Sequence, residues 1–186
     1  MSGRACPWWL GYLLAHPLRR RIHPPDEILG PFVSEGMTVL EPGPGMGFFT
    51  MELARRVGPT GRVVAVDVQS RMLAELDRRA GAAGVRDRLD LRQAGPLGMG
   101  IGDLEGAVDF VLAFAVVHEM PGAPQFFEEA ATALKENGIL LFVEPRMEVS
   151  EPEFQETLQA ASEHRLRVIS RPSIRWSRAA VLEKAP

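Results

Sequence analysis

Hydrophobic residues along this chain follow two different periods. Short uninterrupted apolar runs predict buried strands, and RVVAVD at 62–67 is the clearest because its β-branched residues suit a strand covered on both faces. Apolar positions that recur every three or four residues between these runs predict helices. The predicted strands are 37–41, 62–67, 89–92, 109–114, 139–144, 166–170 and 178–182. Three predicted helices span 26–33, 48–57 and 151–164. Two more are predicted from their boundary residues: one runs from a Ser70 cap to Gly81 or Gly84, and one begins at Pro121-Gly122 and ends at Asn137-Gly138.

The order of these elements predicts the fold class. Strands alternate with helices, which indicates an α/β, doubly wound, Rossmann-like and mostly parallel sheet in a three-layer α/β/α arrangement. Only the linker SRPSIRWS separates the last two strands, and a parallel crossover needs about a dozen residues or more. We therefore expect the last strand to be antiparallel. We expect one domain over 1–186, with an N-terminal helical lid segment over 1–35 and the Rossmann-like core over 36–186.

The stretch VLEPGPGMGFFT at 39–50 joins the end of the first predicted strand to a tight turn. Glu41 ends the apolar run, and Gly43, Gly45 and Gly47 follow at every second position. Glycines so placed allow a sharp turn and a close approach between the backbone and a ligand. The N–H groups at the start of the next helix add partial positive charge. The stretch predicts a site for a nucleotide-like ligand.

A second acid supports this prediction. Asp67 ends the second predicted strand and lies 20 positions after Gly47. In nucleotide-binding βαβ units, an acid at this place accepts hydrogen bonds from the ribose hydroxyls.

The glycine spacing separates two classes of nucleotide-binding turn. A nicotinamide-binding turn reads G-x-G-x-x-G, whereas here the third glycine comes one residue early. The sequence E-P-G-P-G-M-G resembles motif I of the class I S-adenosylmethionine-dependent methyltransferases, an acid followed by G-x-G-x-G. VVAVD resembles the family's second motif, and 109–120 (DFVLAFAVVHEM) resembles its fourth strand and following loop. With the antiparallel last strand, the resemblance covers about residues 36–184.

The resemblance implies S-adenosyl-L-methionine as cofactor and a role for each matching position. Glu41 would hold the methionine amino end, and Asp67 would bind the ribose. The family often has an acid after its third strand that meets the adenine amino group, and this chain has Ala94 and Gly95 there, so a backbone contact would replace it. The implied cofactor-binding residues are Glu41, Pro42, Gly43, Pro44, Gly45, Gly47, Asp67, Val68 and Gln69 (flanking the adenine), Ala94, Gly95, and Phe114 and Ala115 (backbone contacts to the methionine part).

Methyl transfer from a sulfonium requires alignment of an in-line nucleophile in a dry site more than it requires reactive side chains. An acceptor that loses a proton needs a base, and near neutral pH histidine suits that role. His118 follows the fourth predicted strand and is either such a base, a ligand of the acceptor, or a structural residue that orients its loop. Glu144, at the end of the fifth predicted strand, either binds a cationic acceptor or pairs with Arg146 or Arg171. His118 and Glu144 are the candidate catalytic residues, and we predict no metal site.

The composition of the chain limits the classes of ligand that we expect it to bind. The chain of 186 residues has a formal net charge of -3, which gives no large basic field for nucleic acid. The stretch FAVVHE after the fourth predicted strand also lacks the N-P-P-Y-type motif of family members that methylate base amino groups. A single cysteine, Cys6, leaves no thiolate cluster for zinc. We therefore expect a small-molecule acceptor, and the apolar N-terminal segment slightly favours a hydrophobic one.

That segment, CPWWLGYLLA at 6–15, is followed rather than preceded by Arg19, Arg20 and Arg21. This is the wrong order for a secretory signal, and the run is too short to span a bilayer, so we expect a cytoplasmic protein. The segment is either a lid over the cleft, with Trp8, Tyr12 and His16 facing substrate, or a contact with a membrane surface through Trp8, Trp9 and Tyr12. The arginines are either solvated or a gate that attracts an anionic acceptor.

Two alternatives from other classes stay open. A nicotinamide-dependent oxidoreductase is disfavoured by the glycine spacing and by the lack of a Tyr-x-x-x-Lys pair, since Tyr12 is the only tyrosine. A non-catalytic interaction protein that keeps the cofactor fold would also retain these motifs. The sequence does not specify the oligomeric state.

Overall fold

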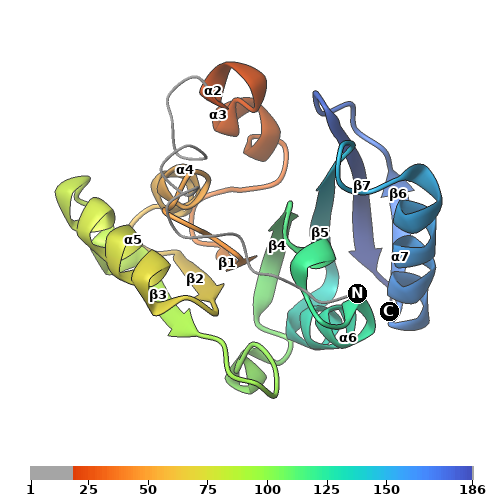
Figure 1. The fold of residues 1–186 in the computed structure, drawn as a ribbon. Helices are drawn as coiled ribbons and strands as arrows, with labels where there is room; N and C mark the ends of the chain where they lie inside the picture. The colour runs from red at the N-terminus through yellow and green to blue at the C-terminus, as the bar shows by residue number, and fades with distance from the viewer. Residues whose placement is uncertain (1–18, 186) are drawn as a thin grey trace. The chain divides into compact units, whose positions relative to one another are not determined.

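The computed structural model describes residues 19–185, which fall into two compact units (Figure 1). Among the described residues, we call 19–100 the N-terminal unit and 101–185 the C-terminal unit. The sequence predictions about Cys6, Trp8, Trp9, Tyr12 and His16 fall outside the described residues. Within residues 19–185, no helix has the length and apolar character that crossing a membrane requires. The expectation of one domain over 1–186 stays a prediction.

The N-terminal unit contains a parallel sheet of three strands in the order β3-β2-β1. The middle strand is fully buried at Val63, Val64 and Ala65, as the continuous β-branched run predicted. Its elements are α2 (Arg19–Ile22), α3 (Pro25–Leu29), β1 (Thr38–Pro42), α4 (Thr50–Val57), β2 (Arg62–Asp67), α5 (Ser70–Ala82), the 3-10 helix η1 (Arg86–Arg88) and β3 (Leu89–Gln93).

Two helices of this unit follow the predicted apolar stripes. Helix α4 buries Leu53, Ala54 and Val57 and ends at Gly58, which has a left-handed φ of 66°. Helix α5 buries the predicted stripe, but its N-cap is Gln69 and not Ser70. The Asp67 carboxylate accepts a hydrogen bond from the Gln69 N–H, so the chain turns into α5 one residue earlier than predicted.

The C-terminal unit has four strands in the order β4-β5-β7-β6. Strands β4 and β5 are parallel, and β7 is antiparallel to both of its neighbours, β5 and β6. The predicted antiparallel last strand is therefore confirmed. Its elements are the 3-10 helix η2 (Gly102–Leu104), β4 (Val108–Phe114), the 3-10 helix η3 (Val117–Glu119), α6 (Ala123–Ala133), β5 (Leu134–Pro145), α7 (Glu151–Glu163), β6 (Leu166–Ser170) and β7 (Ser177–Lys184).

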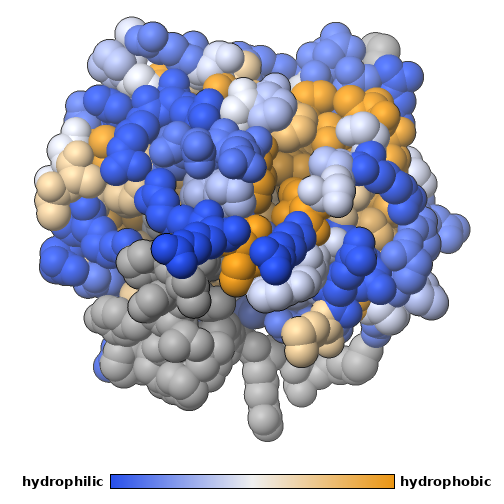
Figure 2. Space-filling view, turned by 90° about the horizontal axis from the view of Figure 1, so that it is seen from above, coloured by the Kyte–Doolittle hydropathy of each residue, from blue (hydrophilic) through white to orange (hydrophobic). Residues whose placement is uncertain are grey.

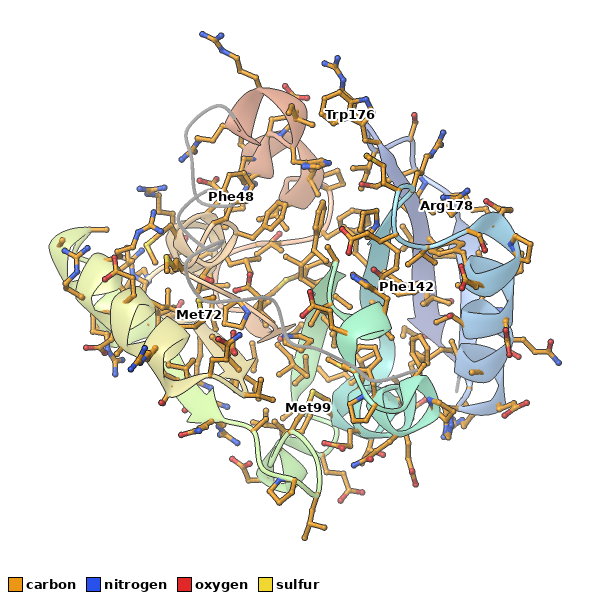
Figure 3. All side chains as sticks on the ribbon, in the orientation of Figure 1. Phe48, Met72, Met99, Phe142, Trp176 and Arg178 are labelled. Atoms are coloured by element: carbon orange, nitrogen blue, oxygen red, sulfur yellow. The ribbon has the colours of Figure 1, made fainter. Side chains whose placement is uncertain are left out.

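Aromatic side chains fill the core between β5 and the helices of this unit. The ring of Phe142 on β5 stacks on Phe154 of α7, with centroids 5.0 Å apart, and meets Phe127 of α6 edge-on at 5.8 Å. Figure 3 shows Phe142 inside this unit. Ser150 and Glu153 form a capping box that begins α7. This core supports the carboxyl ends of β4 and β5, where Phe114 and Glu144 lie.

One boundary differs from the prediction. Asn137 and Gly138 do not close α6, which ends at Ala133, because Leu134 is already extended and pairs with Val108 of β4. The intervening residues bulge out, with Asn137 at a φ of 60°, and pairing resumes at Ile139. The fold class itself, an α/β doubly wound, mostly parallel arrangement with an antiparallel last strand, is confirmed.

Candidate functional site

The glycine turn of the N-terminal unit has the backbone that its sequence predicted. Gly43, Gly45 and Gly47 have left-handed φ values of 65°, 54° and 86°. The Gly43 N–H donates to the Val66 carbonyl at 2.8 Å, and the Gly47 N–H donates to the Pro44 carbonyl at 3.0 Å. The turn is thus joined to β2 and closed on itself.

The last two glycines are required for different reasons. A Cβ at Gly47 would stand 2.6 Å from Leu76 Cδ1 and 3.1 Å from Met51 Cε, so this glycine allows α5 to pack against the turn. A Cβ at Gly45 would meet nothing within 4 Å. The turn is therefore closely packed at Gly47 and open at Gly45, where a ligand can approach the backbone.

Two further residues support this turn, and the sequence analysis missed both. Arg79 of α5 donates to the Met46 carbonyl at 2.6 Å and so holds the turn from outside. Thr50 begins α4 and is completely buried, and its hydroxyl has no hydrogen-bond partner among the described residues. A buried hydroxyl without a partner costs free energy, so it marks a place where a polar ligand group would be stabilised.

Both predicted acids lie at the carboxyl ends of neighbouring strands. Glu41 on β1 is 4% exposed and pairs in register with Ala65, two residues before Asp67 on β2. Asp67 is 8% exposed, and its Oδ1 accepts the Gln69 N–H at 2.9 Å. That hydrogen bond fixes the carboxylate at the end of the strand. Pro42 and Pro44 beside Glu41 are buried.

The residues predicted around the adenine follow β2 and β3. Val68 is 57% exposed and offers an apolar surface next to Asp67. The Ala94 N–H donates to the Asp67 carbonyl and the Gly95 N–H to the Gly98 carbonyl, so both N–H groups are used inside the unit. A backbone contact from Ala94 or Gly95 would therefore be made by a carbonyl, which is the acceptor that an amino group needs.

These observations fit S-adenosyl-L-methionine, the cofactor that the resemblance implied. The glycine backbone is open at Gly45, and an acid is fixed at the end of β2. The buried Thr50 hydroxyl can form a hydrogen bond with a polar ligand group, since it has no partner among the described residues. All of these features lie in the N-terminal unit and together provide apolar, anionic and hydroxyl groups for a nucleoside joined to an amino acid.

In the C-terminal unit, Phe114 and Ala115 end β4. Both are partly buried, and Ala115 has an unusual left-handed φ of 54° for a residue with a side chain. Its N–H donates to the Val143 carbonyl at 2.7 Å. A contact between the Ala115 backbone and a ligand would therefore use its carbonyl.

The structure brings together the two candidate catalytic residues. His118 in η3 and Glu144 at the end of β5 meet with 2.5 Å between His118 Nδ1 and a Glu144 carboxylate oxygen. The other Glu144 oxygen accepts the His118 backbone N–H at 3.2 Å, and the Glu144 residue is 1% exposed. On the opposite side of the ring, His118 Nε2 lies 3.1 Å from the Glu148 carboxylate. Glu144 thus holds both the ring and the backbone of His118.

This contact changes the protonation of the histidine. The hydrogen bond to Glu144 raises the pKa of His118 from its ordinary 6.5 to about 9; burial opposes the rise, and the charges of Glu144 and Glu148 add to it. At pH 7 the imidazole is therefore protonated and donates from both nitrogens.

The alternative pairing predicted for Glu144 is wrong. Arg146 donates from Nε to the Ser177 carbonyl at 2.9 Å, and Arg171 bonds to Gln155 and lies 3.8 Å from a Glu151 oxygen. Both arginines tie the loops around α7 instead. Within residues 19–185, no cluster of three histidine, cysteine or acidic side chains is arranged to hold a metal ion. Arg20 and Arg21 of α2 are exposed.

Comparisons with known proteins point in one direction. Residues 33–177 match the family described as "Methyltransferase domain". A crystal structure of a SAM dependent methyltransferase from Aquifex aeolicus is 22% identical and superposes with a TM-score of 0.83 over 97% of this chain and 100% of that one.

Other similar structures differ in their acceptors. Geranyl diphosphate C-methyltransferase from Streptomyces coelicolor is 16% identical, with a TM-score of 0.73 over 97% of this chain and 85% of that one. A provisionally assigned rRNA methylase from Clostridium thermocellum is 22% identical, with a TM-score of 0.69 over 87% and 93%. At these identities, the likeness shows the fold alone.

Proposed function

We propose that this chain, which belongs to the methyltransferase domain family and is an S-adenosyl-L-methionine-dependent transferase, methylates a small-molecule acceptor by in-line displacement. The family match covers most of the chain. The fold of the similar structures agrees with it. The acceptor class, the displacement geometry and the role of each residue below are our proposal.

The bound cofactor supplies a methyl group that is already activated by its sulfonium. We assign the orientation of the cofactor to the N-terminal unit. Asp67 would accept the ribose hydroxyls, Glu41 would hold the methionine amino end, and the backbone at Gly43, Gly45 and Gly47 would pass close to the ligand. The burial of both acids supports these roles, because a carboxylate with little access to water binds a donor more strongly.

We assign the adenine to the exposed side chain of Val68, to Gln69, and to a carbonyl of Ala94 or Gly95. We assign to Thr50 a hydrogen bond to a polar group of the cofactor, since its buried hydroxyl has no partner among the described residues. Phe114 and the carbonyl of Ala115 would contact the methionine part. No metal and no covalent enzyme intermediate is needed for this reaction.

For His118 we propose a positioning role and not that of a base. A protonated imidazole has no lone pair to take a proton from the acceptor, and the pKa of His118 is raised to about 9. Glu144 instead holds the ring and the backbone of His118, which fixes η3 after β4. The proposed chemistry thus depends on alignment in a site that excludes water and does not use His118 as a base.

The net charge of -3 is the observation that carries the small-molecule assignment. Binding to RNA rests largely on many lysine and arginine contacts to phosphates. Here several arginines are used inside the units: Arg79 holds the Met46 carbonyl, and Arg178 pairs with Glu151. A small acceptor needs no such charge, and the similar geranyl diphosphate enzyme shows that the fold accommodates one. A cytoplasmic location is part of the same proposal.

The acceptor class is tested with methyl-labelled S-adenosyl-L-methionine. The protein is incubated separately with a metabolite extract passed through a small-pore filter, with purified ribosomal RNA, and with a protein pool. We expect label in the filtered metabolites only, and less label with the Asp67→Ala variant at the same subsaturating cofactor concentration. Label that enters RNA or protein and not the metabolites would overturn the small-molecule assignment.

A further inference from the structure

Trp176 is a large aromatic residue with a left-handed backbone and an exposed side chain. Its backbone is left-handed, with a φ of 59°, which is a strained conformation for a bulky side chain. Trp176 is 59% exposed, so burial in the core does not compensate for that strain. Asn137 and Arg165 share the left-handed backbone, but of these three only position 176 presents a large aromatic ring to solvent, and we therefore consider Trp176 a candidate binding residue.

The loop after β5 holds Trp176 in this position. The Arg146 N–H donates to the Trp176 carbonyl at 2.9 Å, and Arg146 Nε donates to the Ser177 carbonyl at 2.9 Å. The next residue on that loop, Met147, is 96% exposed. Trp176 and Met147 therefore belong to two loops that are tied backbone to backbone, and we call these two residues the Trp–Met platform.

The platform lies at the edge of the sheet where the parallel strands β4 and β5 end. Strands β4 and β5 are parallel and end at this edge, and β7 starts there because it is antiparallel to β5, with Ser177 opposite Pro145. Figure 3 shows Trp176 beyond the start of β7, whereas Arg178 lies beside α7. Open α/β sheets bind their ligands at the carboxyl ends of the parallel strands. The platform therefore lies where the C-terminal unit is expected to bind a ligand, which we take to be the methyl acceptor.

A positively charged group lies beside the Trp176 ring. The segment RPSIRWSR at 171–178 contains three arginines and no acid. Arg171 and Arg178 both lie against Glu151, while the guanidinium of Arg175 lies 4.9 Å from the centre of the Trp176 ring. Figure 2 shows hydrophobic side chains that reach the surface among hydrophilic ones. At position 176 an exposed aromatic ring and the Arg175 guanidinium therefore lie side by side.

We infer that the Trp–Met platform and Arg175 recognise the acceptor, and that this acceptor has an apolar body and an anionic group. The apolar body would lie on Trp176 and Met147, and the anionic group would meet the Arg175 guanidinium. An exposed methionine adapts to apolar ligands of different shapes, and the tryptophan ring gives a large contact area at low entropic cost. This inference rests on the proposed function, because it names the acceptor class of the same enzyme.

The inference is tested with three probes that share one apolar chain: decanoate, 1-decanol and decyltrimethylammonium. The chain has three tryptophans, so the double variant Trp8→Phe, Trp9→Phe leaves Trp176 as the only tryptophan, which is excited selectively over Tyr12. We expect decanoate to shift the emission to shorter wavelength and to saturate, with 1-decanol weaker and the cationic probe weakest. Calorimetry on the unmodified chain measures the affinities for the same three probes without the two substitutions.

Substitutions locate the binding. Trp176→Ala should weaken decanoate binding about tenfold, as loss of a large apolar contact does. Arg175→Ala should remove the preference for decanoate over decyltrimethylammonium. Ile169→Ala, which removes an apolar residue that is 49% exposed on β6, and Arg165→Ala, which removes a cation bonded to the Ala185 carbonyl, are matched controls that should change neither.

The melting temperature distinguishes a binding role of Trp176 from a structural one. Trp176→Gly relieves the left-handed strain and should leave the melting temperature unchanged or raised while it weakens decanoate binding. A large fall in melting temperature would show that the tryptophan is structural and would overturn the inference.

The remaining outcomes are also decisive. The inference fails if decanoate leaves Trp176 emission unchanged, if Trp176→Ala binds as tightly as the unmodified chain, or if the cationic probe binds equally well. A shift with phosphatidylglycerol vesicles alone would indicate a lipid surface and contradict it. Thermal shift with S-adenosylhomocysteine separates the two proposals: binding of this ligand without binding of decanoate removes the inference only, and no binding of it removes the proposed function.

Discussion

Replacing His118 by asparagine tests the ion pair at the end of β4 and β5. Asparagine keeps an N–H group near the Glu144 carboxylate but carries no charge at any pH. The contact that it perturbs is the 2.5 Å approach between His118 Nδ1 and a carboxylate that is almost completely buried. The pH dependence of unfolding should therefore differ between the two proteins.

The size of the effect follows from the pKa of His118. A rise from 6.5 to about 9 corresponds to about 3 kcal/mol of stability when the imidazole is protonated in the folded state. The side chain is 19% exposed, and screening by water reduces the expected contribution to about 1–2 kcal/mol. Because the folded pKa is raised, this stability is fully present below about pH 6.5 and is lost as the pH rises through about 9.

The assay is urea unfolding of both proteins at intervals from pH 6 to pH 10. We expect the free energy of unfolding of the unmodified chain to fall by about 1–2 kcal/mol more than that of His118→Asn over this range. The variant His164→Asn, at the C-terminus of α7, is the matched control and should follow the unmodified chain. Parallel profiles for the chain and His118→Asn, or an NMR signal assigned to the His118 imidazole that titrates near pH 6.5, would refute the reasoning.

Three substitutions in the N-terminal unit should separate binding from stability. Asp67→Ala should weaken binding of S-adenosylhomocysteine by about 1–3 kcal/mol in calorimetry, the cost of leaving polar partners unpaired, and unchanged affinity would remove the ribose assignment. Gly47→Ala should destabilise the fold by about 2–4 kcal/mol because its Cβ would stand 2.6 Å from Leu76, whereas Gly45→Ala has equal backbone strain without that clash. We expect Gly45→Ala to reduce affinity more than stability, and the reverse order would contradict the open approach at Gly45. Thr50→Val should raise stability by about 1 kcal/mol in urea unfolding and lower cofactor affinity, since it removes a buried hydroxyl without a partner; an unchanged affinity would exclude Thr50 from the cofactor site.

The elements that depend on local sequence were predictable. The β-branched run at 62–67 gave a buried strand with the predicted bounds, and the short linker before β7 gave the antiparallel pairing. The glycine turn was also predictable, because its left-handed backbone at Gly43, Gly45 and Gly47 is one that glycine adopts readily and other residues rarely do. Asn137 and Gly138 do not end a helix as predicted, since the same two residues that often do so here form a bulge within β5.

The contacts that depend on tertiary structure were not predictable. His118 and Glu144 are 26 residues apart, and only the parallel pairing of β4 and β5 brings them together. Their positions after neighbouring strands were a signal, but the sequence equally allowed Arg146 or Arg171 as partners for Glu144. The missing partner of the Thr50 hydroxyl arises from packing around α4, and nothing in the sequence marks a left-handed tryptophan at position 176.

The glycine turn from Gly43 to Gly47 carries the central claim, that the cofactor is S-adenosyl-L-methionine and not a nicotinamide dinucleotide. Isothermal titration of the unmodified chain with S-adenosyl-L-methionine, S-adenosylhomocysteine and NAD tests it most directly. We predict saturable one-to-one binding of both sulfur ligands and no heat of binding from NAD. Binding of NAD alone would contradict the account.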